Sequence, residues 1–338
     1  HVIKRDYNEC DTVESDFKKF ISNISSNDPA RILSFESTLG YMMHGHKNIS
    51  YCPATILNDE RISDSANGGT GKGILLQSLE HMKKLIMIDG KAFAFEKSFP
   101  YQLVSADTQI LAFDDVKKYF DFERLFSVVT EGLTLEKKNK DAIKIPFSKS
   151  PKVIITTNYP IKGSGASFAR RRWELELATH YTEAYTPTQE FGKFLFGEEW
   201  EDDDWCRFDD YMIKCIQLYL NKGLIESDSV NADKKRLIIN TNSDFIEWCG
   251  LLDTHEANAL LKVNERIHLN SLHYDFTTQY PDYAKFSKRS VSQYLFKKWM
   301  IAYCVYQEGL EPELGRDSVG NWIRIKPRVE GQIQKKLL

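Results

Sequence analysis

The chain has 338 residues, of which 42% are hydrophobic and 28% are charged, and its formal net charge is −3. This composition is typical of a globular protein with a well-filled core, and a chain of this length is expected to form about two or three domains. The weak negative charge excludes a generally basic nucleic-acid coat, and no apolar run approaches the roughly 18 residues that a membrane-spanning helix needs.

The start of the chain and its cysteines bear on the cellular setting. No secretion signal precedes the first domain, so we expect a cytoplasmic protein. The first residue is His1 rather than Met, from which we expect a fragment of a longer protein. The six cysteines form no C-x-x-C pair and have no histidine at zinc-ligand spacing, which predicts reduced and mostly buried thiols.

Apolar periodicity predicts a small helical lead-in from Val13 to Gly45, interrupted at Asp28-Pro29. Continuous apolar runs then predict strands that are buried on both faces. These runs are Ala54 to Leu57, Leu85 to Ile88, Gln109 to Phe113 and Val153 to Thr157. Because helical stretches separate them, we expect an α/β fold with a parallel sheet, whose ligands bind at the carboxyl ends of the strands.

A glycine-rich stretch, Ala66-Asn67-Gly68-Gly69-Thr70-Gly71-Lys72-Gly73, follows the first predicted strand. Glycines allow several backbone N–H groups to converge on the phosphates of a nucleotide, and Lys72 would supply a cation. Against the pattern G-x-x-x-x-G-K-[ST], Ala66 replaces the first glycine and Gly73 replaces the residue whose hydroxyl contacts Mg²⁺. Taken alone, the stretch is equally compatible with a glycine-rich surface turn. The candidate nucleotide-binding residues are Asn67, Gly68, Gly69, Thr70, Gly71, Lys72 and Gly73.

Polar residues follow two further predicted strands. Asp114-Asp115 comes after the third strand and Asn158 after the fourth, so both would lie at the same sheet edge as the glycine loop. Phosphoryl transfer needs a carboxylate near the metal and a group that orients water. We therefore predict that Asp114 positions Mg²⁺, that Asp115 polarises the attacking water, and that Asn158 hydrogen-bonds the γ-phosphate or the water. The alternatives are a pair of helix-capping acids and a turn residue.

Basic residues cluster in two places near these segments. A hairpin is predicted between Glu131 and Ile145, with Lys137, Lys138 and Lys140 at its tip, where they would contact nucleic-acid phosphates unless the tip is simply solvated. Arg170-Arg171-Arg172 follows a Gly/Ser-rich segment and is predicted to include an arginine that reaches a neighbouring subunit's nucleotide. A solvated basic turn is the alternative.

Residues 190 to 240 are expected to be mainly helical, with the acidic run from Glu198 to Asp204 as a solvated loop. Beyond Thr241, short helices, a helix over Ser290 to Cys304 and an alternating strand over Trp322 to Lys326 give the order of a winged helix. One face of the long helix is predicted to carry Val291, Tyr294, Leu295 and Trp299. The residues expected to bind duplex DNA are Lys288, Arg289, Lys297, Lys298, Arg324 and Lys326. A structural or protein-binding winged helix is equally open.

Taken in this order, the glycine loop with Lys72, Asp114-Asp115, the basic hairpin, Asn158 and the triple arginine resemble superfamily 3 helicases of the AAA+ class, especially poxvirus-type and phage-type primase-helicases. The resemblance covers residues 51 to about 180. It implies Walker A, Walker B, B′ and C motifs in that order. It also implies a hexameric ring with ATP and Mg²⁺ at the subunit interfaces, an arginine supplied in trans, and single-stranded DNA held in the pore and unwound with 3′ to 5′ movement.

The predicted organisation is an N-terminal helical segment (1–50), an AAA+-type P-loop NTPase core (51–190), a helical linker or lid (191–240) and a winged-helix-like DNA-binding domain (241–338). The predicted function is that of an ATP-dependent replicative DNA helicase encoded by a phage or mobile element in a bacterial host cell. The sequence leaves open whether a primase domain precedes His1. Two alternatives stay open, the first of them because Gly73 lacks a hydroxyl and a winged helix is predicted. One is an origin-binding or loading factor that uses ATP for ring assembly, and the other is an ATPase regulator that does not bind nucleic acid.

Overall fold

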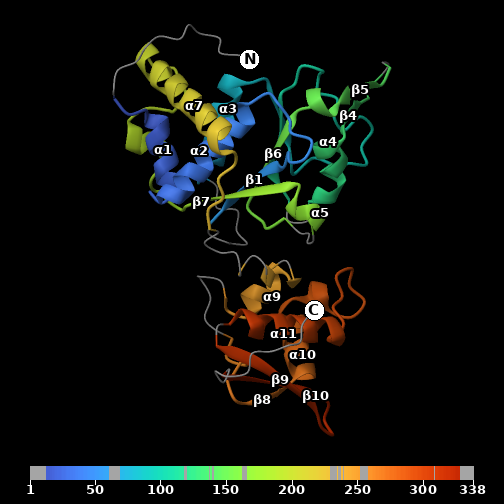
Figure 1. Ribbon diagram of the computed structural model, residues 1–338. Helices are drawn as coiled ribbons and strands as arrows, with labels where there is room; N and C mark the ends of the chain where they lie inside the picture. The colour runs from blue at the N-terminus through green and yellow to red at the C-terminus, as the bar shows by residue number, and fades with distance from the viewer. Residues whose placement is uncertain are drawn as a thin grey trace. The chain divides into compact units, whose positions relative to one another are not determined.

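The computed structural model describes residues 13–60, 69–117, 120–136, 138, 141–161, 166–228, 234, 237–238, 240–251, 258–307 and 309–327. The chain divides into two compact units, His1–Val230 and Asn231–Leu338, which run from blue to yellow and from orange to red in Figure 1. No helix of these described ranges is long and apolar enough to cross a bilayer. The five cysteines that they include are all free, and four of them are buried, as predicted.

A five-stranded parallel sheet forms the centre of the first unit, which confirms the predicted α/β class. Its strand order is β2-β3-β6-β1-β7, and every neighbouring pair is parallel. The strands are β1 (Ala54–Asp59), β2 (Leu85–Asp89), β3 (Ile110–Val116), β6 (Lys152–Thr157) and β7 (Arg172–Leu177). The four predicted runs are thus all strands. The fifth, β7, lies at one edge.

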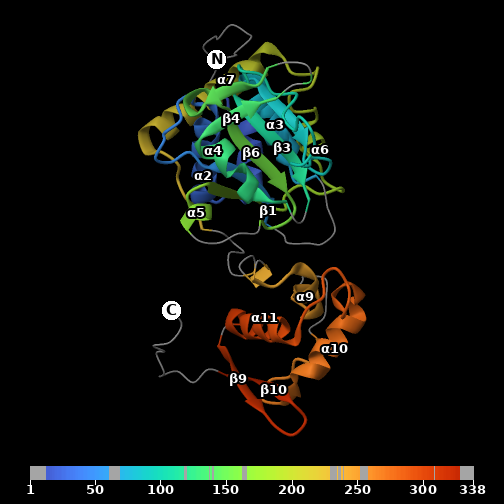
Figure 2. The same cartoon turned by 90° about the vertical axis from the view of Figure 1, so that its right-hand side faces the viewer.

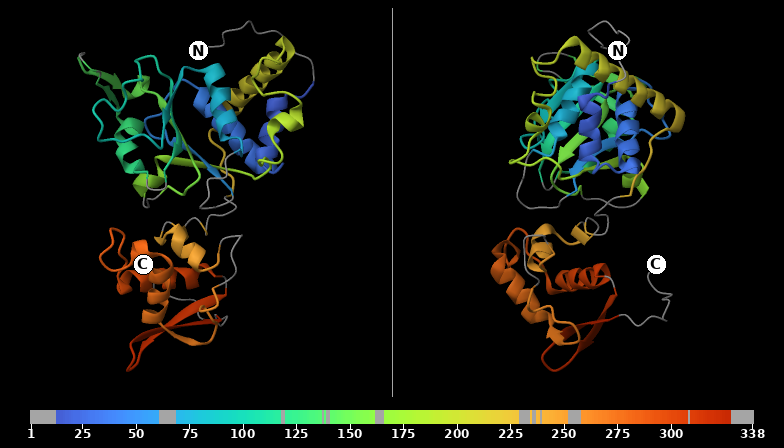
Figure 3. Two further views of the ribbon diagram at one scale, coloured as in Figure 1. Left: turned by 180° about the vertical axis from the view of Figure 1, so that it is seen from behind. Right: turned by 90° about the vertical axis from the view of Figure 1, so that its left-hand side faces the viewer.

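Helices cover the two faces of this sheet unequally (Figures 1 and 3). On one face lie the longer helices α1 (Asp16–Ile24), α2 (Pro29–Met43), α3 (Lys72–Met82) and α7 (Asp202–Lys222). The other face is covered by the short helices η1 (Phe122–Leu125) and α4 (Phe126–Thr130) and by the hairpin of β4 (Gly132–Leu135) and β5 (Ile143–Pro146). Short elements complete the unit: η2 (Phe147–Lys149), α5 (Ala166–Ala169) and α6 (Pro187–Phe191).

Alternation along the strands separates two hydrophobic cores. In β3, Ile110 and Ala112 belong to the core under α1, α2, α3 and α7, whereas Leu111 and Phe113 belong to the core under α4. Because side chains alternate with a period of two, residues of equal parity at the strand ends share a face. This alternation places Asp59 of β1 and Asp114 of β3 on the face that α3 covers.

Local capping chemistry explains two helix starts. The predicted helical lead-in is confirmed as α1 and α2, and its break is the start of α2, where the Asp28 carboxylate accepts a hydrogen bond from the Arg31 backbone N–H (2.8 Å). The predicted acidic loop is wrong from Glu201 onward. Its last residues form the first turn of α7, in which Asp204 accepts from the Glu201 N–H (3.1 Å), because carboxylates stabilise the positive end of a helix.

Lys152 begins β6 as a buried cation, with only 4% of its surface exposed. Its Nζ donates to the backbone carbonyls of Tyr41 and His44, the latter at 2.6 Å, and lies 4.0 Å from the centre of the Tyr41 ring. Burial lowers the pKa of Lys152 to about 7, since no carboxylate of the described residues compensates the lost hydration. The amino end of the sheet therefore contains a titratable group whose charge opposes folding.

The second unit combines short helices, one longer helix and a small antiparallel sheet, and its assignment as a winged helix stays a prediction. Its elements are α9 (Ser243–Trp248), β8 (Arg266–His268), α10 (Leu269–Gln279), η3 (Pro281–Tyr283), α11 (Gln293–Tyr306), β9 (Leu310–Arg316) and β10 (Asn321–Pro327). The strands form an antiparallel sheet in the order β8-β10-β9, with α10 and α11 on one side of the β9–β10 hairpin (Figure 2). The aromatic rings of Phe245, Trp248, Phe276 and Phe296 pack together between its helices.

The predicted face of α11 is wrong for two of its residues. Tyr294 is 70% exposed and Leu295 is also exposed, whereas Val291 and Trp299 are buried. The helix begins only after Ser292, whose hydroxyl accepts from the Leu295 backbone N–H, and its buried residues are Phe296, Trp299, Met300, Tyr303 and Cys304. The cap sets the phase of the helix, and therefore its buried face starts one turn later than predicted.

Candidate functional site

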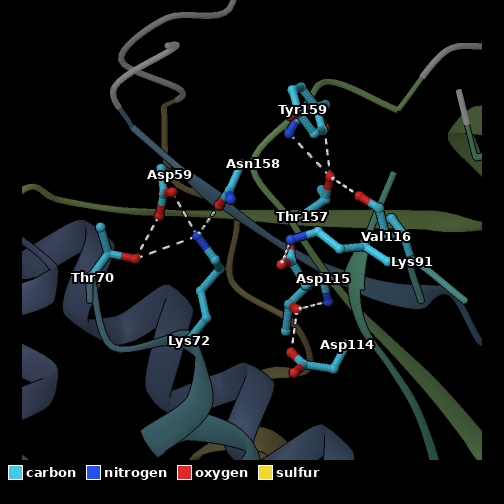
Figure 4. Close-up of polar contacts among 11 residues, drawn as sticks. Asp59, Thr70, Lys72, Lys91, Asp114, Asp115, Val116, Thr157, Asn158 and Tyr159 are labelled. Atoms are coloured by element: carbon cyan, nitrogen blue, oxygen red, sulfur yellow. Dashed lines mark hydrogen bonds and ion pairs between the residues drawn. The ribbon is translucent and has the colours of Figure 1, made fainter. Parts of the chain in front are cut away.

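Polar side chains lie at the carboxyl ends of three neighbouring strands of the parallel sheet (Figure 4). Asp59 ends β1, Asn158 directly follows β6, and Asp114-Asp115 lies near the end of β3. The strand β6 lies between the other two. The chain leaves β1 toward β2 and leaves β6 toward β7, that is, toward opposite edges of the sheet, and ligands of open α/β sheets bind at such a point.

The described part of the glycine loop has a backbone that only glycine adopts easily. Gly69 has a φ of 99° and Gly71 a φ of 107°, and α3 begins at the next residue, Lys72. A Cβ at Gly71 would lie 2.6 Å from Cζ of the buried Phe20, so the loop is backed directly by α1. The candidate residues Asn67 and Gly68, like Ala66, lie outside the described residues.

Lys72 brings the loop together with two strand ends. Its Nζ donates to Asp59 Oδ2 (2.6 Å) and to Asn158 Oδ1 (2.7 Å), and it lies 3.4 Å from Thr70 Oγ1. The Thr70 hydroxyl in turn donates to Asp59 Oδ1 (2.7 Å). The side chains of Lys72 and Asp59 are only 14% and 9% exposed. Lys72 and Asn158, which were predicted to share a site, are therefore in direct contact.

Sequence reasoning missed Asp59, although a signal was present. The apolar run ends at Leu57, which predicts that Asn58 and Asp59 belong to a polar connection. In fact β1 continues to Asp59, which pairs in register with Leu177 of β7. Asp59 is an acid at the carboxyl end of a parallel strand, as Asp114 is in β3. The same reasoning that identified Asp114 from the sequence could therefore have identified Asp59.

Asp114 and Asp115 lie within β3, so the helix-capping alternative is wrong. The Thr156 hydroxyl donates to Asp114 Oδ1 (2.6 Å) and accepts from the Asp115 backbone N–H (2.7 Å). Asp115 has a φ of 52°, and the pairing of β3 with β6 shifts register between Phe113 and Val116. Such an irregularity re-aims a side chain at the end of a strand. Thr156 therefore fixes both acids from the neighbouring strand.

Lys91 is a second residue that the sequence did not reveal. Its Nζ lies 2.5 Å from Asp115 Oδ2, and this hydrogen bond raises the pKa of Lys91. The turn that carries it is tightly fixed, because Asp89 Oδ1 accepts from the Lys91 N–H (2.9 Å) and the Gly90 N–H donates to Asp114 O (2.6 Å). A Cβ at Gly90 would lie 2.6 Å from that same carbonyl, so only glycine fits there. The end of β2 thus positions a cation on Asp115.

The three arginines lie at the opposite end of the sheet. Arg172 pairs in register with Ala54, at the amino end of β1, and is therefore about 16 Å along the strand from Asp59. Arg172 contacts Glu174 (3.2 Å), and the Arg171 guanidinium lies 4.6 Å from the centre of the Phe126 ring. Arg170 is exposed and has no side-chain partner among the described residues. None of the three reaches Lys72 within its own chain.

The predicted basic hairpin is present, since β4 and β5 pair antiparallel from Gly132 with Pro146 to Leu135 with Ile143. Lys138 is exposed in its turn. Lys137 and Lys140 lie outside the described residues. A lysine is therefore available near the tip of this hairpin.

The predicted basic residues of the winged helix fall into two groups. Lys288, Arg289 and Lys298 are exposed and Lys297 is partly exposed, all on α11 or the segment before it, and Arg289 lies 4.0 Å from the Asp282 carboxylate. In the β9–β10 hairpin, by contrast, Arg324 pairs with Glu313 (3.2 Å) and Lys326 pairs with Glu311 (3.4 Å) across the strands.

Two exposed aromatic residues that the sequence did not predict to bind nucleic acid lie beside the first basic group. Lys298 Nζ is 4.7 Å from the centre of the exposed Tyr294 ring, and Lys285 Nζ is 5.0 Å from the centre of the Phe286 ring, which is almost fully exposed. Interleaved cations and exposed rings are typical of nucleic-acid surfaces, because rings stack on bases and cations contact phosphates. The helix rather than the hairpin carries the positive charge that no carboxylate of the described residues neutralises.

Comparison with known proteins gives likenesses in structure only. No family model matches this chain, and no curated protein matches it. The apo A form of the NrS-1 C-terminal region is similar at a TM-score of 0.41 and 16% identity, covering 96% of this chain and 79% of that one. A second structure of that region, residues 305–718, gives 0.42 and 17%, covering 94% and 77%. A candidate ATPase from Cytophaga hutchinsonii gives 0.30 and 11%, covering 70% and 71%. At these TM-scores the likenesses support no inference about function, which rests on the site itself.

Proposed function

We propose that this chain is a DNA-stimulated ATPase of the superfamily 3 helicase type, which couples ATP hydrolysis to movement along single-stranded DNA and so to unwinding. One observation carries the proposal. A glycine-loop lysine at a helix N-terminus, an asparagine after the next strand and an acidic pair on the strand beyond it meet at one sheet edge. These are the parts that phosphoryl transfer requires.

Each side chain has a role that follows from its position. Lys72, at the start of α3, would bind the β- and γ-phosphates together with the backbone N–H groups of the helix N-terminus. Asn158 lies 2.7 Å from Lys72 Nζ and would hydrogen-bond the γ-phosphate or the attacking water. Asp115 would polarise that water, with Lys91 fixing the position of its carboxylate. When bound with ATP, Mg²⁺ supplies positive charge against the phosphates, and the Asp114 carboxylate fits it because Mg²⁺ prefers oxygen ligands.

The position of the arginines favours assembly into a ring. Arg170 is exposed at the amino end of the sheet, far from the Lys72 of its own chain. An exposed arginine in that position would reach the nucleotide of a neighbouring subunit, as the predicted hexamer requires. Lys138, with Lys137 and Lys140, would then contact the phosphates of single-stranded DNA in the pore. The exposed lysines of α11 would bind duplex DNA.

A second candidate function is an origin-binding or loading factor that uses ATP for ring assembly rather than unwinding. Two observations favour it: Gly73 provides no hydroxyl for the metal, and α11 presents exposed lysines in the predicted winged helix. Hydrolysis separates the two functions, because a loading factor needs to bind ATP but not to turn it over on single-stranded DNA.

The test is ATP turnover by the full chain with Mg²⁺, with and without single-stranded DNA, in the wild type and two variants. We expect DNA to stimulate turnover. Asp115→Asn should lower turnover by about 10²- to 10⁴-fold while ATP still binds. Lys72→Ala should abolish turnover and weaken ATP binding. Binding without DNA-stimulated turnover in the wild type would favour the loading factor, and full activity in Lys72→Ala would refute the site.

Mixing two inactive variants tests the shared site. Arg170→Ala should lower turnover by about 10³- to 10⁵-fold if this arginine acts on a neighbour's nucleotide. A mixture of Arg170→Ala and Lys72→Ala subunits should regain part of the activity, since some interfaces then combine an intact arginine with an intact lysine. If the mixture stays inactive, the arginine does not act in trans.

A further inference from the structure

The space around position 73, where the nucleotide-binding pattern has a serine or threonine hydroxyl, is open. Gly73 is the second residue of α3, and a Cβ built there would meet no atom of the described residues within 4 Å. A serine would therefore fit at position 73 without displacing any of these neighbours. What the site lacks, compared with the pattern G-x-x-x-x-G-K-[ST], is an oxygen ligand and not the room for one.

A hydroxyl and a carboxylate lie beside the Lys72 ammonium group. Thr70 Oγ1 donates to Asp59 Oδ1 at 2.7 Å, and the other carboxylate oxygen of Asp59 lies 2.6 Å from Lys72 Nζ. Thr70 and Asp59 come from the two ends of the connection that contains the glycine loop, and both side chains are largely buried. Their oxygens therefore border the point at which Lys72 would hold the phosphates.

We propose that Asp59 and Thr70 supply the contacts to Mg²⁺, directly or through its bound waters, that a hydroxyl at position 73 would otherwise provide. This inference rests on the proposed function, since it concerns the metal that accompanies ATP. Carboxylate and hydroxyl oxygens are suitable Mg²⁺ ligands, and Mg²⁺ is commonly held by one or two carboxylates together with substrate phosphates. In agreement with that mode, the described ranges contain no group of three or more His, Cys, Asp or Glu side chains that would cage a metal alone.

Electrostatics gives a reason why Asp59 needs the cation. Lys72 Nζ already donates to Asp59 (2.6 Å) and Asn158 (2.7 Å), so a phosphate that binds it would have to share its positive charge with Asp59. Asp59 is only 9% exposed, so a carboxylate left there beside phosphates would be a poorly hydrated charge facing like charges, which is costly. A divalent cation between the carboxylate and the phosphates removes that repulsion. Asp59 is thus expected to make nucleotide binding depend on the metal.

The competing explanation is that Asp59 only holds Lys72, with no part in metal binding. The two explanations predict different effects of Asp59→Asn on nucleotide affinity. As a mere counter-ion, Asp59 competes with the phosphates, so Asp59→Asn would tighten nucleotide binding equally with and without Mg²⁺. As a contact to the metal, Asp59 would contribute only when Mg²⁺ is present. The ratio of affinities with and without Mg²⁺ therefore separates them.

The experiment measures that ratio with fluorescent methylanthraniloyl-ADP and the full chain, in Mg²⁺ or in EDTA. A second readout is Mn²⁺ binding to the ADP complex by electron paramagnetic resonance. Asp59→Asn and Thr70→Val should each lower metal affinity by about 10- to 100-fold, whereas Thr70→Ser should retain it. Adding Gly73→Ser to Thr70→Val should restore metal binding, because the new hydroxyl has space to form.

The outcomes distinguish this inference from the proposed function. If Thr70→Val leaves Mn²⁺ affinity and the Mg²⁺ ratio unchanged, or if Gly73→Ser restores nothing to it, the inference is overturned while the nucleotide site stands. If the wild-type chain binds no ADP analogue in either buffer, the proposed function falls, and the inference with it. Rescue by Gly73→Ser also excludes misfolding as the cause of the Thr70→Val defect.

Discussion

Alanine substitutions at the three glycines around Lys72 should differ sharply in cost, although the substitutions are chemically identical. Gly73 has space and ordinary helical geometry, so Gly73→Ala should be neutral or stabilising by up to about 1 kcal/mol. Gly69 has open space but a φ of 99°, so Gly69→Ala should cost about 1 to 3 kcal/mol in backbone strain. Gly71→Ala adds to similar strain a contact of 2.6 Å with Phe20, and overpacking of this kind costs about 1 to 3 kcal/mol more.

Hydrogen–deuterium exchange of the β1 and β6 amides is the suitable assay. The chain has two units, so a single melting curve does not report the stability of either one. Exchange of buried strand amides gives the free energy of opening of the first unit by itself. We expect the order Gly71→Ala, Gly69→Ala, Gly73→Ala from most to least destabilised.

The contact with Phe20 can be isolated by a double-mutant cycle. Phe20→Leu replaces the ring that a Cβ at position 71 would meet with a shorter side chain. It should therefore relieve part of the cost of Gly71→Ala and leave the cost of Gly69→Ala unchanged. Equal costs at positions 69 and 71, or no relief by Phe20→Leu, would refute the conclusion that α1 backs the phosphate loop. The N-terminal helix would then have no direct part in shaping the site.

Two further predictions concern charge. Burial lowers the pKa of Lys152 from 10.5 to about 7, so between these values the unfolded chain binds more protons than the folded one, and stability should rise as the pH increases from 7 toward 10. Lys152→Met should flatten that rise in the free energy of opening measured by hydrogen exchange of the β6 amides, and an unchanged slope would contradict it. Replacing Lys297 and Lys298 with alanine should weaken duplex DNA binding and reduce the slope of log affinity against log salt by about 0.9 for each phosphate that the protein no longer neutralises. Arg324→Ala should have a smaller effect in the same titration, because Arg324 is paired with Glu313, and equal effects would place the DNA on the β9–β10 hairpin instead.

The sequence predicts those residues of the site that lie at the carboxyl ends of strands. Apolar runs locate buried strands, parallel strands bring their carboxyl ends to one edge, and the residues after them must therefore meet. That reasoning places Lys72 and Asn158 within one site, and they are 2.7 Å apart. It misses Asp59 because the predicted strand ends at Leu57, two residues too early. A polar residue at the end of a strand cannot be told from the start of a loop by its sequence.

What the sequence could not supply depends on packing between segments. Lys91 reaches Asp115 because Gly90 allows the turn after β2 to lie against the backbone of Asp114. No local pattern encodes that approach. The exposed side of α11 likewise depends on where Ser292 starts the helix, and a shift of one residue rotates a helix by about 100°. Contacts of this kind are fixed by tertiary structure and not by propensity.

Two of the three carboxylates in the site are paired with a lysine of the same chain, and this affects how a nucleotide would bind. Lys72 is paired with Asp59, and Asp115 is paired with Lys91. A phosphate that binds Lys72 must therefore compete with an existing ion pair, and the net gain is the difference between two strong interactions. Affinity for ATP is then determined less by Lys72 than by what compensates Asp59 once Lys72 shares its charge with a phosphate. If that compensation comes from the metal, Mg²⁺ should control nucleotide affinity in this chain more strongly than the lysine does, and the Asp59→Asn variant should lose that control while it keeps the lysine.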